Sequence, residues 1–179
     1  LKPNKMQVAF VKNVMEMRTQ HIDRALLLSS TGTGKTLASA FMLREMGTKR
    51  ALFVVHREQI AKQTLKSYKR IFGSSRTYGL LSGNSRDFDA EFLFATMQMI
   101  SKEEIMSHYD PGDFEVIILD ECHHAGAESY QKIMRYFKPK FWLGMTASPD
   151  TNQYDIYSIF EHHIAYEIRL QQALEEDLL

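Results

Sequence analysis

The feature that most constrains the fold is a set of short, continuously apolar runs separated by longer amphipathic stretches. Leu26, Leu27 and Leu28 are apolar without interruption, and so are residues 116–119. A strand with one face in water would alternate apolar and polar residues, so these runs indicate strands that are covered on both faces. Strands that alternate with helices form parallel βαβ units with right-handed crossovers. Sheets of this kind bind ligands at the carboxyl ends of their strands.

The pattern predicts one α/β domain. Its 179 residues suffice for a core, because a domain of this size buries roughly 70% of the surface that its unfolded chain exposes. We expect a mainly parallel sheet of about seven strands with helices on both faces. The strands are predicted at residues 25–28, 51–55, 77–81, 92–95, 116–119, 141–145 and 164–168. The helices are predicted at residues 5–17, 35–46, 58–72, 97–107, 129–137 and 154–160.

A loop rich in small residues follows the first predicted strand and leads directly into a helix. It reads Ser29-Ser30-Thr31-Gly32-Thr33-Gly34-Lys35-Thr36. The glycines let the backbone turn its N–H groups around a phosphate, and the helix adds its positive N-terminal end. Lys35 can pair with the β- and γ-phosphates, and the Thr36 hydroxyl can ligate Mg²⁺. We therefore expect ATP to bind residues Ser30, Thr31, Gly32, Thr33, Gly34, Lys35 and Thr36.

Two points bear on the strength of this phosphate-loop prediction. Ser29 stands where the usual pattern has its first glycine. A turn that contains a lysine by chance is the alternative interpretation. The strand before the loop and the helix after it favour the phosphate loop.

An acidic pair ends another apolar strand. Residues 116–119 run into Asp120-Glu121-Cys122-His123. Asp120 is placed to hold Mg²⁺ through water, and Glu121 can orient and deprotonate the attacking water. A solvated loop or helix cap is the alternative for such a pair. A zinc site built from Cys122, His123, His124 and Asp120 is disfavoured, because no second cysteine exists to complete a paired ligand set.

These residues resemble the motifs of superfamily 2 helicases. Asp-Glu-Cys-His is similar to the DExH form of motif II, and the phosphate loop is similar to motif I. Thr146-Ala147-Ser148 resembles motif III, residues 54–59 resemble motif Ia, and residues 95–100 resemble motif Ib/Ic. The resemblance covers residues 3 to about 150 in the family's order and is strongest to bacterial DEAD/DEAH-box proteins of the type III restriction (Res subunit) kind. It implies the first RecA-like P-loop NTPase domain of a motor.

The resemblance also implies roles for individual residues. Gln7 would read the adenine, although its spacing from Pro3 is longer than in the common arrangement. His123 would take part in catalysis and coupling, and Thr146, Ala147 and Ser148 would relay the ATP state to the nucleic-acid face. The nucleic-acid contacts would come from His56, Arg57, Ser82, Gly83, Thr96 and Gln98. The cations Lys62, Lys66, Lys69 and Arg70 share one side of a predicted helix, for which a solvated face is the alternative.

Partners and compartment are expected from the same features. The net charge is 0, no apolar run approaches the ~18 residues of a membrane span, and the start is unlike a signal peptide. We expect a cytoplasmic chain without a membrane or zinc partner. We expect it to be a segment of a longer protein: residues 1–168 would form the ATP-binding domain, and residues 169–179 would begin the connection to a second RecA-like domain. DNA is favoured over RNA by the family analogy alone.

Three alternatives to a helicase stay open. A small-molecule kinase with a phosphate loop would need an acceptor site, and the motif III match would be coincidence. An ATP-gated interaction module would not need the acidic pair and Lys35. Within the motor interpretation, the alternative is a double-strand DNA translocase or restriction subunit that never unwinds its track.

Overall fold

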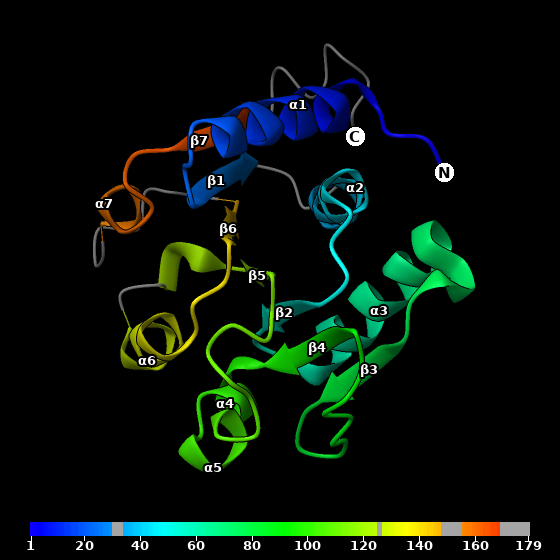
Figure 1. Cartoon of the computed structure of the whole chain (residues 1–179), viewed down its shortest axis with the longest axis vertical. Coiled ribbons are helices and arrows are strands. Elements are labelled where there is room, and N and C mark those ends of the chain that lie inside the picture. The colour runs from blue at the N-terminus through cyan, green and yellow to red at the C-terminus, as the bar shows by residue number, and fades with distance from the viewer. Residues whose placement is uncertain (30–33, 125–126, 148–154, 169–179) are drawn as a thin grey trace.

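A computed structural model describes residues 1–29, 34–124, 127–147 and 155–168, in which seven strands form one parallel sheet (Figure 1). The strand order is β3-β4-β2-β5-β6-β1-β7, and every pair of neighbouring strands is parallel. The predicted α/β architecture is therefore confirmed. The strands are β1 (Arg24–Ser29), β2 (Ala51–Val55), β3 (Tyr78–Leu81), β4 (Phe92–Thr96), β5 (Val116–Leu119), β6 (Phe141–Thr146) and β7 (Ile164–Ile168).

The central strands are buried on both faces, as their continuous apolar composition requires. In β5, Val116 and Ile118 pack into one apolar cluster, while Ile117 and Leu119 pack into a second cluster on the opposite face. Successive side chains of a strand point to opposite faces, so each run contributes to two cores. The sheet therefore lies between two layers of helices.

The helices divide between the two faces of the sheet. α1 (Lys5–Thr19), α2 (Lys35–Met46) and α3 (Glu58–Phe72) cover one face, and α1 contacts α2 while α2 contacts α3. The other face carries α4 (Met97–Ile100), α5 (Glu103–Met106), α6 (Glu128–Tyr136) and α7 (Ile156–Ile159), as Figure 1 shows. Two short 3₁₀ turns, η1 (Gly73–Ser75) and η2 (Cys122–His124), complete the described elements.

One predicted helix is wrong. The stretch 97–107 forms two short helices, α4 and α5, and Lys102 between them is extended. The buried residues are Met97, Met99, Ile100, Ile105 and Met106. At about 100° per residue these side chains would point all around a straight helix, so a single helix could not bury them together. The break lets both pieces turn their apolar side chains into one core.

The other predicted boundaries agree with the observed ones or differ from them by one or two residues. α1 extends to Thr19, β6 extends to Thr146, and α7 begins at Ile156. The predicted connection at residues 169–179 lies outside the described residues. None of the described helices is both long and apolar enough to cross a membrane.

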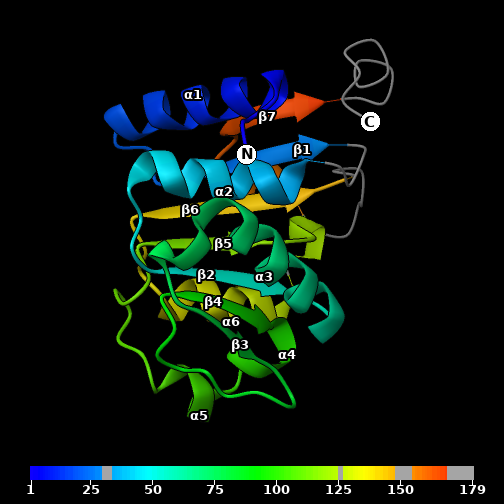
Figure 2. The same ribbon diagram turned by 90° about the vertical axis from the view of Figure 1, so that its right-hand side faces the viewer.

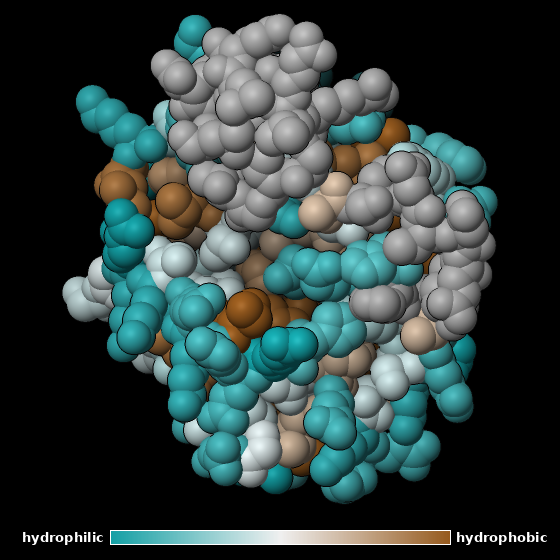
Figure 3. Space-filling model, turned by 180° about the vertical axis from the view of Figure 1, so that it is seen from behind, coloured by the Kyte–Doolittle hydropathy of each residue, from teal (hydrophilic) through white to brown (hydrophobic). Residues whose placement is uncertain are grey.

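All strands run in one direction, so their carboxyl ends lie on one side of the molecule. Figure 2 shows the arrows side by side, and Figure 3 views the molecule from the side to which they point. Hydrophilic side chains gather over the lower part of that side, around a recessed apolar area. The predicted site residues are expected there.

Candidate active site

Three predicted motifs lie at the ends of neighbouring strands. β1, β6 and β5 are consecutive in the sheet, with Leu28 in register with Thr146 and Leu119 in register with Gly144. The residues that follow these strands therefore leave the sheet at a common edge. The topology brings the phosphate loop, the acidic pair and Thr146 together, although they are far apart in the sequence.

A glycine in a left-handed conformation precedes α2. Gly34 precedes the helix with a φ of 87°, a left-handed conformation that favours glycine. A Cβ at this position would lie 3.3 Å from Met6 Cε and 3.4 Å from Gln7 Nε2. Lys35 begins the helix and is buried, and Thr36 follows half-buried. The predicted ligands Ser30, Thr31, Gly32 and Thr33 lie outside the described residues.

Gln7 connects the start of α1 to Gly34, the residue that precedes α2. Asn4 caps the helix: its Oδ1 accepts from Gln7 N at 2.8 Å, and its own N–H donates to Gln7 Oε1 at 2.9 Å. The Gln7 side chain also donates from Nε2 to the Gly34 carbonyl at 3.2 Å. The predicted adenine-reading residue is thus buried beside Gly34, and its capping box sets the orientation of its amide.

Hydrogen bonds hold the backbone of the acidic pair, Asp120 and Glu121, at the end of β5. Asp120 N–H donates to the Val54 carbonyl at 3.0 Å, which continues the β2–β5 pairing by one residue. Glu121 N–H donates to Asp120 Oδ1 at 3.0 Å. Glu121 has a φ of 54°, which is uncommon for a residue with a side chain and turns the chain sharply at the end of β5.

Burial and charge act in opposite directions on Asp120. Burial raises the pKa of the Asp120 carboxyl, the charge of Lys35 lowers it, and the charge of Glu121 raises it. Lys35, at the start of α2, is therefore near enough to Asp120 for its charge to act on this carboxyl. Glu121 is more open, with its side chain 43% exposed.

His123 connects the acidic pair with the end of β6. Its Nδ1 lies 2.9 Å from Thr146 Oγ1 and 3.4 Å from Glu121 Oε2. The predicted coupling residues therefore begin in contact with the acidic motif. Ala147 is exposed, and Ser148 lies outside the described residues.

Cys122 points away from this polar cluster. It is fully buried in the apolar core under α4 and α6. Burial raises the pKa of its thiol, and Asp120 raises it further, so the thiolate that zinc requires is disfavoured. Among the described residues, no group of three or more His, Cys, Asp or Glu side chains could hold a metal ion.

The predicted nucleic-acid residues lie along the same edge, at the ends of β2, β3 and β4. His56, Arg57, Gly83 and Gln98 are exposed, and Thr96 is 8% exposed. Ser82 differs because it has no exposed surface, so Gly83 presents this loop to solvent. The burial of Ser82 was not evident from the sequence.

The predicted basic face of α3 is exposed. Lys62, Lys66, Lys69 and Arg70 all lie on the solvent side, while Tyr68 is buried against the sheet. Two of these cations contact the protein: Lys62 Nζ lies 3.4 Å from Glu58 Oε1, and Lys69 Nζ lies 5.6 Å from the centre of the Tyr78 ring. These contacts fit a solvated helix face.

Tyr130 is a site residue that sequence reasoning did not identify. Its ring lies on the buried side of α6, and its hydroxyl lies 2.9 Å from the Asp120 carbonyl and 3.0 Å from His56 Nε2. In the sequence Tyr130, Ile133 and Phe137 follow the spacing of a helix that packs on a core. That spacing predicts burial, but it does not indicate what the hydroxyl contacts.

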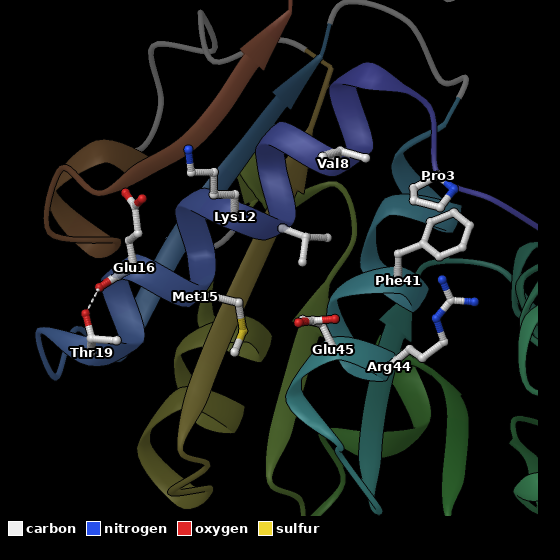
Figure 4. A pocket seen from close by; sticks show the side chains of 10 residues that line it. Pro3, Val8, Lys12, Met15, Glu16, Thr19, Phe41, Arg44 and Glu45 are labelled. Atoms are coloured by element: carbon white, nitrogen blue, oxygen red, sulfur yellow. Dashed lines mark hydrogen bonds between the residues drawn. The ribbon is translucent and has the colours of Figure 1, made fainter.

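One apolar recess is separate from this site. A cavity of about 500 Å³ lies between α1 and α2. Figure 4 shows Val8 and Met15 of α1 on one side of this cavity and Phe41, Arg44 and Glu45 of α2 on the other. It contains none of the predicted catalytic residues.

Comparisons with known sequences identify a family and relatives. A family model described as "Type III restriction enzyme, res subunit" matches residues 1–151. The chain is 28% identical over 190 residues to the Type I restriction enzyme EcoAI endonuclease subunit of Escherichia coli, a match that covers 99% of this chain and 23% of that protein. It is 28% identical over 119 residues to the putative ATP-dependent helicase IRC3 of Saccharomyces cerevisiae, covering 61% of this chain and 17% of that protein.

Solved structures share the fold. A nuclease-deletion mutant of the Type ISP restriction-modification enzyme LlaGI, in complex with a DNA substrate mimic, matches with a TM-score of 0.72 and 19% identity, over 99% of this chain and 21% of that one. The Pyrococcus furiosus Hef helicase domain matches with a TM-score of 0.67 and 20% identity, over 89% of this chain and 37% of that one. The chain therefore spans only a minor part of these proteins. Because the family model covers residues 1–151 of 179, the chain belongs to the type III restriction enzyme res-subunit family.

Proposed function

We propose that this chain is the ATP-binding domain of a nucleic-acid motor, which couples Mg-ATP hydrolysis to movement on DNA or to its unwinding. The observation that carries the proposal is the convergence of three elements at one sheet edge. The left-handed Gly34 at the start of α2, the carboxylates after β5 and the His123–Thr146 contact all lie there. A single apolar pocket or a single acidic pair would not support this function.

The start of α2 would hold the phosphates of ATP. Gly34 and the preceding loop would supply N–H donors, and Lys35 would supply a positive charge. Thr36 and Asp120 offer the hard oxygen donors that suit Mg²⁺, with Asp120 acting through water. Mg²⁺, when bound, supplies positive charge against the phosphate oxygens.

Glu121 would act as the general base. It is the more exposed of the two carboxylates, and its backbone turns it away from the strand. In that position the carboxylate could accept a proton from the attacking water. His123 would transmit the change in ATP state from Glu121 to Thr146, since its ring lies near both Glu121 Oε2 and Thr146 Oγ1.

DNA is the proposed track. The Escherichia coli relative is a restriction endonuclease subunit, which favours DNA. Another relative, from Mus musculus, is named an ATP-dependent RNA helicase. His56, Arg57, Gly83, Thr96 and Gln98 would contact the phosphate backbone, with little reading of sequence.

A second RecA-like domain would complete the motor. The chain spans 23% of the Escherichia coli relative, so most of that protein lies outside the match. Arginine fingers raise phosphoryl-transfer rates by about 10³–10⁵ in related enzymes, and the proposed second domain would supply them. The isolated chain should therefore hydrolyse ATP very slowly.

The restriction-enzyme relatives favour one alternative within the motor class. A double-strand DNA translocase without unwinding would use the same residues, because the motifs of this domain serve movement in either case. An ATP-gated interaction module is the alternative outside that class.

The decisive experiment is steady-state ATPase of the natural full-length protein with no polymer, single-stranded DNA, duplex DNA or RNA. Stimulation by DNA that is lost in Glu121→Gln is the expected result. Glu128→Gln, an exposed carboxylate at the start of α6, is the matched control and should keep wild-type stimulation. Stimulation by RNA alone would reassign the track. Nucleotide binding without stimulation by any polymer would refute the motor and favour the interaction module.

A further inference from the structure

One buried hydroxyl joins two parts of the proposed site. Tyr130 Oη lies 3.0 Å from His56 Nε2, 2.9 Å from the Asp120 carbonyl and 3.4 Å from the Glu121 carbonyl. His56 is exposed at the end of β2, whereas Tyr130 is 1% exposed. The two rings lie 5.8 Å apart, centre to centre. A surface loop is thus connected through a buried side chain to the main chain of the acidic pair.

The chemistry of the groups sets the direction of these hydrogen bonds. The Asp120 and Glu121 carbonyls can only accept, so the Tyr130 hydroxyl must donate its single proton to them. The Tyr130 oxygen is then left to accept from His56, which must carry a proton on Nε2. The chain of donors therefore runs from His56 through Tyr130 to the Asp120 carbonyl.

The contacted main chain is the part of the site that most needs support. Glu121 has a φ of 54°, a strained conformation for a residue with a side chain. Its two flanking carbonyl groups both face the Tyr130 hydroxyl. The Asp120 N–H is held by Val54 in β2, two residues before His56. A shift of the β2 end would therefore reach the acidic pair by two connections.

We propose that Tyr130 is a positioning residue that couples the His56 loop to the backbone of Asp120 and Glu121, so that DNA bound at this loop adjusts the carboxylate that activates water. The inference rests on the proposed function. This connection runs from β2 through Tyr130 to the acidic pair. It is separate from the contact between His123 and Thr146, which joins the acidic motif to β6. Because Tyr130 lies behind the acidic pair and is buried, it acts through other residues.

Tyr130→Phe tests the coupling because it keeps the buried ring and removes only the hydroxyl. In the full-length protein, the ratio of DNA-stimulated to unstimulated turnover should fall about fivefold, the size that loss of one hydrogen bond gives. The KM for ATP should stay the same, because the start of α2 is untouched. Tyr109→Phe is the matched control: Tyr109 is also buried and donates to a backbone carbonyl, that of Phe88, at 2.8 Å. It should keep the wild-type ratio.

His56→Ala supplies a second, independent variant, since His56 is exposed and its replacement leaves the core intact. It should lower the stimulation ratio, and adding Tyr130→Phe should lower it no further, because both changes break one connection. If the two losses of stimulation ratio multiply in the double variant, the proposed coupling is overturned. A wild-type ratio in Tyr130→Phe, or an equal loss in Tyr109→Phe, would overturn it as well. A wild-type protein that no polymer stimulates would instead overturn the proposed function, which distinguishes the two failures.

Discussion

Gly144 offers a quantitative test of the packing that supports the site. It lies in β6, in register with Leu26 of β1 and Leu119 of β5, and is buried. A Cβ at this position would lie 2.5, 2.8 and 2.9 Å from three atoms of the Phe160 ring. Gly144→Ala therefore forces either the ring or the strand to move.

The size of the effect follows from these distances. Ordinary contact begins at 3.4 Å, so the ring must retreat by roughly 1 Å. Phe160 has no exposed surface and belongs to the apolar cluster on that face of the sheet, so a shift of its ring disturbs close-packed neighbours. Overpacking of this kind costs about 1–3 kcal/mol, which for a domain of this length lowers the melting temperature by about 2–12 °C.

Denaturant unfolding and thermal melting of the chain measure this cost. Gly112→Ala is the control, because its added Cβ would meet nothing within 4 Å, and it should change stability by less than about 0.5 kcal/mol. Phe160→Leu alone should destabilise the chain by leaving a void, yet it should recover about 1 kcal/mol of the Gly144→Ala loss when the two are combined. A Gly144→Ala variant as stable as the control would refute the reasoning, and so would strictly additive losses in the double variant.

Two further predictions concern helix caps. Asn4→Ala removes the capping-box bond that Asn4 Oδ1 accepts from the Gln7 N–H at the start of α1 and should lower the free energy of unfolding by about 1 kcal/mol, measured in denaturant; an unchanged midpoint would contradict it. Hydrogen bonds from the Ser158 side chain and backbone lower the pKa of Asp155, so its ionised form stabilises the start of α7 at neutral pH, and this contribution is lost as pH falls through the lowered pKa. The melting temperature of wild type should exceed that of Asp155→Ala at neutral pH and converge with it in acid, whereas a constant difference would exclude this cap as its cause.

The strands and the chemical motifs were predictable from the sequence because both are encoded locally. Burial on two faces requires an unbroken apolar run, which is why residues 116–119 were identified as β5 with their observed bounds. The glycines before Lys35 and the carboxylates after β5 are needed at fixed spacing within one loop. That the two motifs follow strands at one edge of the sheet was predictable from a general rule, since parallel strands end at a common edge.

Only the tertiary structure decided which strands are neighbours and what each buried polar group contacts. The order β2-β5-β6-β1 places His56, Asp120 and Thr146 at the ends of consecutive strands, and it results from packing between residues far apart in the chain. The break between α4 and α5 and the burial of Ser82 likewise depend on the core around them. The helical spacing of apolar residues predicts that a side chain such as Tyr130 is buried. It carries no information on the partner of the hydroxyl, because that partner comes from elements 10 and 74 residues away.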